Sequence, residues 1–351
     1  MTAIEWLDSL SPWPSDGFGL ERMQELLREL ADPQEAFPAV HVVGSNGKST
    51  ATRTIEALLL AERLSVGATV SPHVRSWAER ITIGGREADV ERALARARPA
   101  AERLHATQFE TITAAALAEF AEQGVDVAVV EAGLGGRLDA TNVLRTRAVL
   151  LTNVALEHTD VLGDTREAIA AEKLAVAKPG AVVVLPDREF VSLVPSNEIR
   201  LGGAREAAEA FLGRELDAEV EVALPGRLER RDGEVRDGAH NPAGARWLVD
   251  RLAPSRYVVV ASVLRDKDAD AMLRELSRLG ETLVATESSN PRALTVAELA
   301  ERARAHFAHV EAVAEPSEAV ARAHELGGDV LVTGSLYLLG DLAAGEAEPP
   351  A

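Results

Sequence analysis

The feature that most constrains the fold is a repeated alternation of short apolar runs with helix-like segments. Apolar runs occupy residues 40–43, 68–70, 125–130, 148–151 and 181–185, and segments with helical periodicity occupy residues 49–63, 113–122 and 165–178. Strands that alternate with helices pair in parallel and form a sheet that helices cover. In such a sheet, ligands bind beyond the carboxyl ends of the strands. We therefore expect functional side chains directly after these runs.

The alternation begins again after Pro225-Gly226. Strands are predicted at Val235 and at 257–261, 282–285 and 330–333, with helices at 241–252, 268–279, 295–305 and 316–326. A chain of 351 residues is also longer than a single core usually supports. We predict two α/β domains, residues 1–224 and 225–351, with the boundary near residues 222–227. The Ala/Glu/Pro-rich stretch 343–351 is expected to fray.

The composition excludes several classes of protein. Acidic residues outnumber basic ones by 56 to 37, and the net charge of −19 repels nucleic-acid phosphates. Cysteine is absent, so disulfides, thiolate metal sites and thiol nucleophiles are excluded. No apolar run is long enough to span a membrane, and the N-terminus lacks a signal-peptide pattern. We expect a cytoplasmic protein that binds neither nucleic acid nor membrane, and whose metal ligands are oxygen or nitrogen atoms.

The first apolar run leads into a candidate phosphate-binding loop, Gly44-Ser45-Asn46-Gly47-Lys48-Ser49-Thr50. Its glycines let the backbone aim N–H groups at phosphate oxygens, and Lys48 adds a positive charge. Either Ser49 or Thr50 offers a hydroxyl to Mg²⁺. The loop is shorter than the usual Gly-x-x-x-x-Gly-Lys-Ser/Thr, and a plain glycine-rich turn capped by Ser and Asn is the alternative interpretation. We expect Lys48 to be required for ATP turnover but not for folding.

Polar side chains follow two further runs at the same predicted sheet edge. Glu131 comes directly after the third run and precedes a glycine cluster; it suits a metal ligand, although a solvated loop acid or a helix cap is the alternative. Glu157, His158 and Asp160 follow the fourth run. His158 is either a neutral imidazole ligand or a hydrogen-bonded structural residue, and Asp160 is an alternative ligand. Lys173 lies in the next helix, where a solvated lysine is the ordinary interpretation.

A second polar cluster, Asp237-Gly238-Ala239-His240-Asn241-Pro242, lies between a predicted strand and a predicted helix that Asn241 is suited to cap. Asp, His and Asn at one strand end suit contacts with a nucleotide ribose or a substrate carboxylate. Arg227 lies on the preceding linker. Lys267 and Arg292 are further candidates for binding an anion.

In their order and approximate spacing, these motifs resemble those of the folylpolyglutamate synthase / dihydrofolate synthase family, a branch of the Mur ligase superfamily. The resemblance extends from about residue 16 to 341. The segments that carry it are Gly44–Thr50, Ser71-Pro72-His73, Glu79-Arg80-Ile81, Phe109-Glu110, Glu131–Asn142, Asn153–Gly163, Glu172-Lys173, Lys178-Pro-Gly180, Pro225-Gly-Arg227, Asp237–Pro242, Lys267-Asp268 and Thr333–Tyr337. The resemblance implies a P-loop-type parallel-sheet ATPase domain followed by a smaller Rossmann-like α/β domain.

The resemblance also implies a role for each candidate residue. The implied nucleotide-binding residues are Gly44, Ser45, Asn46, Gly47, Lys48, Ser49, Thr50, Arg227, Asp237 and His240. The positions that match the family's Mg²⁺ ligands are Ser71, Glu131 and His158. Lys173 matches a lysine that is carbamylated in the family, and it is implied to be catalytic together with Lys48 and His158. The candidates for contact with a pterin are Ser76, Trp77, Phe109 and Thr111.

The implied reaction is the ATP-dependent joining of L-glutamate to tetrahydrofolate, to dihydropteroate, or to both. The substrate carboxylate attacks the γ-phosphate, and the amine of glutamate then attacks the acyl phosphate. This chemistry requires charge stabilisation at the phosphoryl group and two well-oriented substrates. The resemblance therefore implies ATP and Mg²⁺ as cofactors, small-molecule substrates and a monomeric enzyme.

The chain departs from the family pattern in two places. The family's Gly-Thr-Asn-Gly-Lys-Gly-Ser reads Gly44-Ser-Asn-Gly-Lys48-Ser49-Thr50, which leaves open which hydroxyl meets the metal. The stretch from Gly180 to Pro225 is short, and at residues 203–210 the family's Gly-x-His-Gln-x-x-Asn-Ala is replaced by Gly-Ala-Arg-Glu-Ala-Ala-Glu-Ala. Two alternatives remain open. One is a nucleotide-binding paralogue with lost or altered ligase activity; the other is a different Mur-type amino-acid ligase, which would normally carry an additional N-terminal UDP-binding domain.

Overall fold

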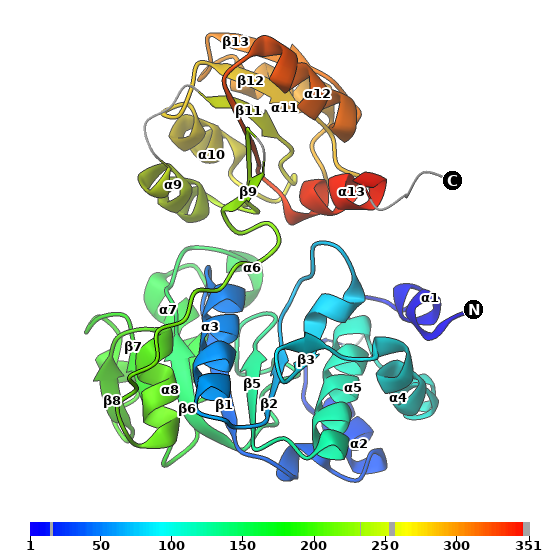
Figure 1. Ribbon diagram of the computed structural model, residues 1–351, viewed down its shortest axis with the longest axis vertical. Coiled ribbons are helices and arrows are strands. Elements are labelled where there is room, and N and C mark those ends of the chain that lie inside the picture. Colours follow the sequence, from blue (N-terminus) through cyan, green and yellow to red (C-terminus); the bar gives the residue numbers. More distant parts are fainter. Residues whose placement is uncertain (15–16, 232, 253–256, 347–351) are drawn as a thin grey trace. The chain divides into compact units, whose positions relative to one another are not determined.

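The computed structural model describes residues 1–14, 17–231, 233–252 and 257–346, and the chain divides into two compact units (Figure 1). The first unit comprises Met1–Pro72 and Ser76–Val222, and the second comprises His73–Arg75 and Ala223–Ala351. Each unit contains one sheet of mainly parallel strands. The predicted fold class, two successive α/β domains, is confirmed.

An eight-stranded sheet in the order β4-β3-β2-β5-β1-β6-β7-β8 forms the centre of the first unit. Its strands are β1 (Ala39–Val43), β2 (Val66–Thr69), β3 (Ile81–Ile83), β4 (Arg86–Glu87), β5 (Val127–Glu131), β6 (Thr146–Leu151), β7 (Val182–Leu185) and β8 (Glu198–Leu201). The pairings of β2 with β3 and of β3 with β4 are antiparallel, and the other pairings in this sheet are parallel. Because β1 pairs in parallel with β5 on one side and β6 on the other, the carboxyl ends of these three strands lie side by side.

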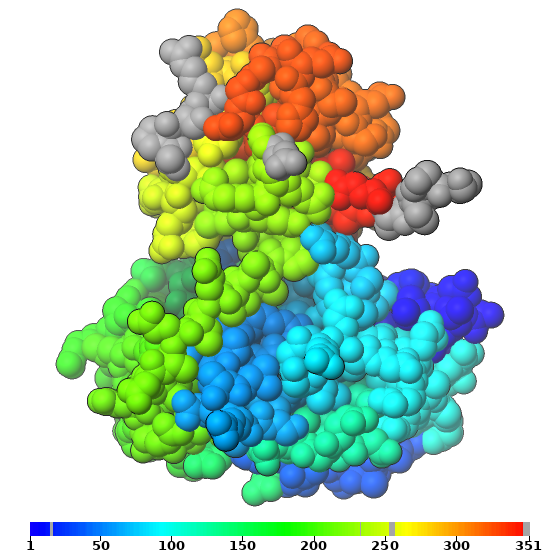
Figure 2. All heavy atoms as spheres, in the orientation of Figure 1, coloured from blue at the N-terminus to red at the C-terminus, as the bar shows by residue number. Residues whose placement is uncertain are grey.

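Helices cover both faces of this sheet. They are α1 (Ala3–Asp8), α2 (Glu21–Glu29), α3 (Lys48–Ala61), α4 (Val90–Leu104), α5 (Gln108–Gln123), α6 (Thr159–Leu162), α7 (Arg166–Leu174) and α8 (Ala204–Leu212), with 3-10 turns η1 (Pro33–Glu35), η2 (Trp77–Arg80) and η3 (Val191–Leu193). Helices α1, α2, α4 and α5 contribute to one buried apolar cluster, and α3 and α8 contribute to another. Figure 2 shows α3 and α8 side by side on one face. Helix α8 therefore supports the helix that follows the candidate phosphate loop.

The second unit has a six-stranded sheet in the order β13-β12-β11-β14-β10-β9. Its strands are β9 (Glu229–Arg231), β10 (Glu234–Arg236), β11 (Tyr257–Ala261), β12 (Thr282–Ala285), β13 (His309–Ala312) and β14 (Asp329–Thr333). Its helices are α9 (Pro242–Arg251), α10 (Ala269–Leu276), α11 (Val296–Ala303), α12 (Pro316–Leu326) and α13 (Leu336–Glu346). Only β9 runs antiparallel to its neighbour. In neither unit does a helix of the described ranges have the length and apolar character needed to cross a bilayer.

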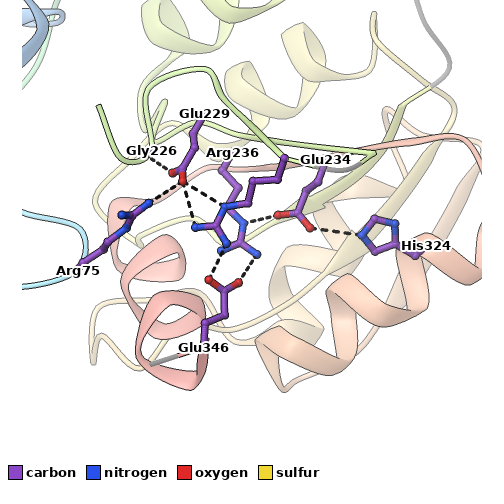
Figure 3. A network of polar contacts seen from close by, with 8 residues as sticks. Arg75, Gly226, Glu229, Glu234, Arg236, His324 and Glu346 are labelled. Carbon is purple, nitrogen blue, oxygen red and sulfur yellow. Dashed lines mark hydrogen bonds and ion pairs between the residues drawn. The ribbon is translucent and has the colours of Figure 1, made fainter. Parts of the chain in front are cut away.

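A network of ion pairs holds the edge of the second sheet (Figure 3). Glu229 accepts hydrogen bonds from Nη2 of Arg75 (2.8 Å) and from Arg231 (3.0 Å). Glu346 is bound in turn by Arg231 and Arg236, each at 2.6 Å. The expectation that the chain frays from residue 343 onward is therefore wrong as far as Glu346, because these two arginines hold the end of α13. Residues 347–351 lie outside the described residues.

Candidate functional site

The candidate phosphate loop connects β1 to α3, as the sequence predicts. Gly44 has φ +147°, and a β-carbon there would lie 1.9 Å from Oγ1 of Thr152, so a larger residue cannot fit without moving the loop. Gly47 has φ +78° and is the N-cap residue of α3. Lys48 begins that helix, and its Nζ donates to the carbonyl oxygen of Gly44 at 3.1 Å. The lysine therefore folds back over the loop.

The connection that follows β6 holds the phosphate loop from the other side. Asn46 and Asn153 exchange two hydrogen bonds, from N of Asn46 to Oδ1 of Asn153 (3.0 Å) and from Nδ2 of Asn153 to O of Asn46 (2.9 Å). The hydroxyl of Thr152 donates to the same carbonyl oxygen at 2.8 Å. Oγ of Ser45 accepts from N of Ala155 at 3.0 Å. The protein itself thus fixes the conformation of the loop.

Glu131, the last residue of β5, lies beside the first turn of α3. It is 3% exposed. Its Oε1 accepts from Oγ of Ser49 at 3.2 Å, and its Oε2 accepts from the backbone N–H of Ser71 at 3.0 Å. Thr50 is exposed. Of the two hydroxyls that the sequence left as alternatives, Ser49 is therefore the one in contact with the candidate metal carboxylate.

His158 lies on the connection after β6, where it has φ +48° and directly precedes α6. Asp160 lies in the first turn of that helix and is exposed. Among the residues that the structure describes, no three or more His, Asp and Glu side chains gather as a metal site. The metal site that the sequence predicts is of another kind, because its ligands are one carboxylate (Glu131), one imidazole (His158) and one serine (Ser71). The structure brings Glu131 into contact with the Ser49 hydroxyl and with the backbone N–H of Ser71, and His158 follows β6, which lies on the other side of β1 from β5.

Lys173 is not the solvated lysine of the ordinary interpretation, because it is only 2% exposed. Its Nζ donates to the carbonyl oxygen of Gly44 at 2.9 Å and to Oε1 of Glu157 at 3.1 Å. Burial lowers the pKa of Lys173 despite the opposing charge of Glu157. Burial alone would raise the pKa of Glu157. The positive charge of Lys173, with a smaller contribution from that of Lys48, outweighs this effect and lowers the pKa to about 2. Glu157 was not among the predicted site residues.

In the second unit, Asp237 lies at the end of β10. Its carboxylate accepts from the N–H groups of Leu228 (2.8 Å) and Ala239 (2.9 Å). Burial raises its pKa, and these hydrogen bonds and the charge of Arg227 oppose the shift. Nδ1 of His240 lies 2.8 Å from the carbonyl oxygen of Gly238. Asp237, Arg227 and His240 therefore meet around one turn.

The turn leads into α9, and Asn241 caps this helix as predicted, because its side chain accepts from N of Gly244 at 2.7 Å. The two further candidates of this unit share one acidic partner. Lys267 and Arg292 lie 3.3 Å and 3.7 Å from Asp266. Their charges are thus partly neutralised within the unit.

Comparison with known proteins identifies the family. The Mur ligase middle domain matches residues 42–201, and the Mur ligase glutamate ligase domain matches residues 226–336. A dihydrofolate synthase/folylpolyglutamate synthase of Mycobacterium tuberculosis is 32% identical over 391 aligned residues, which cover 84% of this chain and 80% of that protein. The chain belongs to the dihydrofolate synthase/folylpolyglutamate synthase family. The resemblance seen in the sequence motifs is confirmed.

Solved structures agree with this membership. The folylpolyglutamate synthase of Mycobacterium tuberculosis complexed with ADP and AMPPCP superposes with a TM-score of 0.88 at 28% identity, covering 99% of this chain and 98% of that chain. The bifunctional folylpolyglutamate synthase/dihydrofolate synthase of Yersinia pestis complexed with AMPPNP and Mn ion superposes with a TM-score of 0.86 at 28% identity, and the match again covers 99% of this chain and 98% of that chain. The chain therefore has the fold of the family over nearly its whole length.

The four residues that the resemblance assigns to the pterin differ in accessibility. Trp77 is 7% exposed, and its Nε1 donates to Oδ1 of Asp8 at 2.9 Å. Thr111 is fully buried in α5. Ser76 is exposed at the start of η2, and Phe109 is half-buried near the start of α5. Ser76 and Phe109 are thus the two of these residues that offer accessible surface in this member of the family.

The shortened segment between Gly180 and Pro225 uses its polar side chains for internal bonds. Nη1 of Arg205 donates to the carbonyl oxygen of Leu216 at 2.7 Å, and Oε1 of Glu209 accepts from N of Leu216 at 3.0 Å. Both side chains belong to α8, and they stand where the family's usual motif has His and Asn. In this member, α8 therefore fastens the chain that follows it.

Proposed function

We propose that this chain uses ATP to join L-glutamate to a folate, either by extending tetrahydrofolate or by converting dihydropteroate to dihydrofolate. The observation that carries the proposal is the cluster at the carboxyl ends of β1, β5 and β6. Lys48 folds over the phosphate loop, Ser49 contacts Glu131, and Lys173 is buried against Gly44. A cradle for phosphates beside a buried carboxylate and a second buried lysine suits phosphoryl transfer.

In the proposed reaction, a carboxylate oxygen of the pterin substrate attacks the γ-phosphorus of ATP, and ADP leaves. The amine of glutamate then attacks the carbonyl carbon of the acyl phosphate, loses a proton, and expels inorganic phosphate as the amide forms. Lys48 and the N–H groups of the loop stabilise the charge on the phosphoryl oxygens. The rigid attachment of the loop to Asn153 keeps these groups oriented before the substrates arrive.

We infer Mg²⁺ at the carboxylate of Glu131. The donors fit this ion, because the Ser49 hydroxyl and the Glu131 carboxylate are hard oxygen ligands already in contact. Ser71 and His158 are proposed as the remaining protein ligands. When bound, the ion supplies electrostatic stabilisation of the phosphoryl oxygens. The Mn ion in the complex of the Yersinia pestis relative supports a divalent metal in this family.

Lys173 is proposed to become carbamylated. Carbamylation requires a neutral amine, and burial moves the pKa of Lys173 in the direction that favours one. The amine nitrogen attacks carbon dioxide and loses a proton, which turns a cation into an anion beside the phosphate loop. Glu157, which now accepts a hydrogen bond from this nitrogen, would have to lose that contact or to accept from the carbamate N–H.

The remaining assignments follow the family. We propose that residues 1–224 form the ATP-binding domain and residues 225–351 the C-terminal ligase domain, which contributes Arg227, Asp237 and His240 to the nucleotide. Ser76 and Phe109 are proposed to contact the pterin, and the buried Trp77 and Thr111 to support them from the core. We further propose that the enzyme acts as a monomer in the cytoplasm.

Incorporation of radiolabelled glutamate tests the proposal. Purified protein is incubated with ATP, magnesium and labelled glutamate, with dihydropteroate in one set of reactions and tetrahydrofolate in the other. Label in the folate product of at least one set is expected in the wild type, and none in the Lys48→Ala variant. Binding of ATP without incorporation from either substrate would instead support a paralogue that has lost ligase activity.

A further inference from the structure

Arg227 lies on a turn whose backbone is left-handed on both sides of it. Gly226 has φ +63° and Leu228 has φ +47°. This conformation is unfavourable for a residue with a side chain, so the contacts around Leu228 must maintain it. A β-carbon on Gly226 would lie 2.6 Å from Cδ1 of Leu339, which places the turn directly against helix α13. The path of the backbone through Arg227 therefore depends on its surroundings.

Two carboxylates bind the backbone of this turn. The N–H of Gly226 donates to Oε2 of Glu229 at 2.9 Å, and the N–H of Leu228 donates to Oδ2 of Asp237 at 2.8 Å. Each of the two residues that flank Arg227 thus gives its N–H to a carboxylate. Asp237 is already a candidate for contact with the nucleotide, whereas Glu229 has no role in the site described above.

The two oxygens of the Glu229 carboxylate have different partners (Figure 3). Oε1 accepts from Nη2 of Arg75 at 2.8 Å and from Nε and Nη2 of Arg231 at 3.1 Å and 3.0 Å, and Oε2 accepts from Gly226. Arg231 is bound in turn by Glu346 at the end of α13. Burial alone would raise the pKa of Glu229, but the hydrogen bonds from Gly226 and Arg231 and the charges of both arginines lower it. The two guanidinium groups therefore orient an ionised carboxylate whose other oxygen faces the turn.

The side chain of Arg227 lies on the backbone that Gly226 shares with Gly238. Its Nη1 donates to the carbonyl oxygen of Gly226 at 3.3 Å, and a β-carbon on Gly238 would lie 2.7 Å from the same nitrogen. The N–H of Gly238 donates to that carbonyl oxygen at 2.9 Å. A shift of Gly226 would therefore displace the guanidinium group of Arg227.

We propose that Glu229 is a positioning residue for the nucleotide, because it fixes Gly226 and, through Gly226, the guanidinium group of Arg227. Arg75 and Arg231 hold Glu229 in turn. The inference rests on the proposed function in one respect, since it requires Arg227 to contact the phosphates of the nucleotide. It predicts that loss of Glu229 weakens nucleotide binding, and that this effect disappears when Arg227 is absent.

Calorimetric titration of the whole chain with AMPPNP and magnesium, without pterin or glutamate, tests this proposal. Glu229→Ala removes the carboxylate, Arg227→Ala removes the guanidinium group, and the double variant completes a thermodynamic cycle. Glu311→Ala is the matched control. Glu311 accepts from Nε and Nη2 of Arg322 at 2.8 Å and 3.0 Å, and its strand β13 forms the opposite edge of the sheet from β9, which contains Glu229.

The expected result is an effect that depends on Arg227. Arg227→Ala should raise the Kd of AMPPNP by about tenfold or more, and Glu229→Ala should raise it by about fivefold or more. The double variant should match Arg227→Ala within about twofold, because Glu229 then has no guanidinium group to position. Glu311→Ala should stay within about twofold of the wild type. If Glu229→Ala fails to fold, Glu229→Gln decides by the same comparison, because it keeps the size of the side chain and removes the charge that the two arginines bind.

Three results would overturn the inference. The first is an unchanged Kd of AMPPNP in both Glu229 variants, and the second is an unchanged Kd in Arg227→Ala. The third is a loss of the same size with and without Arg227, which indicates general damage to the second unit. A wild type that binds AMPPNP but incorporates no glutamate would instead refute the proposed function and leave the role of Glu229 intact, so the two failures are distinguishable.

Discussion

Replacement of His41 by Gln should remove a large part of the acid sensitivity of the first unit. His41 is fully buried in the central strand β1, and burial, with a smaller contribution from the charge of Lys178, lowers its pKa to about 3. Nε2 of His41 lies 2.8 Å from Oγ1 of Thr141, and the Thr141 hydroxyl donates to Asp139, the nearest acidic group in this hydrogen-bond chain. The folded protein therefore keeps His41 neutral at pH values where the unfolded chain protonates it. The amide of Gln can still donate to Thr141.

The magnitude follows from the two pKa values. The histidine of the unfolded chain has a pKa of about 6.5, so its contribution to stability is complete above that pH and is lost as the pH falls toward 3. The unfolded chain gains a proton that the folded chain does not, and each pH unit in this window costs about 1.36 kcal/mol. Between pH 7.5 and pH 5 the loss from His41 amounts to about 2 kcal/mol.

Denaturant unfolding at several pH values measures this loss. Tryptophan fluorescence reports mainly on the first unit, which contains Trp6, Trp13 and Trp77. The wild type should lose about 2 kcal/mol more than His41→Gln between pH 7.5 and pH 5. The control is His105→Gln, which replaces an exposed histidine of the same unit and should follow the wild type. A constant difference between wild type and His41→Gln across this pH range would refute the reasoning.

Three further predictions concern the nucleotide site. Gly44→Ala should weaken ADP binding by about tenfold or more, because the added β-carbon would meet Thr152. Calorimetry measures the ADP affinity, and Gly180→Ala is the matched control, because Gly180 also has a positive φ but has open space around it. Lys173 should show a carbamate resonance in ¹³C NMR after incubation with ¹³C-bicarbonate, and Lys173→Met should lack it; a spectrum without this resonance in the active wild type contradicts carbamylation. Arg205→Ala should destabilise the first unit by about 1–3 kcal/mol in denaturant unfolding but leave ADP affinity unchanged, and weakened ADP binding would assign Arg205 to the nucleotide instead.

The buried parallel strands were predictable, and the edges of the sheets were not. Strands such as Tyr257–Ala261 and Thr282–Ala285 match the predicted ranges because burial on both faces requires continuous apolar residues. Strand β13, His-Val-Glu-Ala, lies at a sheet edge with partly exposed residues and has no such signal. Helix α4 contains Pro99 and many arginines, and its apolar face is made mainly of small alanines. Local composition therefore did not reveal these elements.

The site was predictable where a strand end determines a residue's place. Glu131 ends β5 and Lys48 follows the neighbouring strand β1, and the rule for parallel sheets brings them to one edge. The partnership of Lys173 with Glu157 depends on how α7 packs, so no sequence spacing predicts it. His41 gave a usable signal, since it is a polar residue inside an apolar run. Its partner Thr141 is distant in sequence and becomes evident only in the folded chain.

The most direct test of the proposed ligase activity follows an oxygen atom. Dihydropteroate or tetrahydrofolate labelled with ¹⁸O in its carboxylate is supplied with ATP and glutamate, and mass spectrometry examines the folate product and the released phosphate. Formation of an acyl phosphate predicts one added glutamate per ADP released and one ¹⁸O atom transferred to the phosphate. A glutamylated product formed with unlabelled phosphate would contradict the mechanism, and the absence of any glutamylated product would contradict the ligase function.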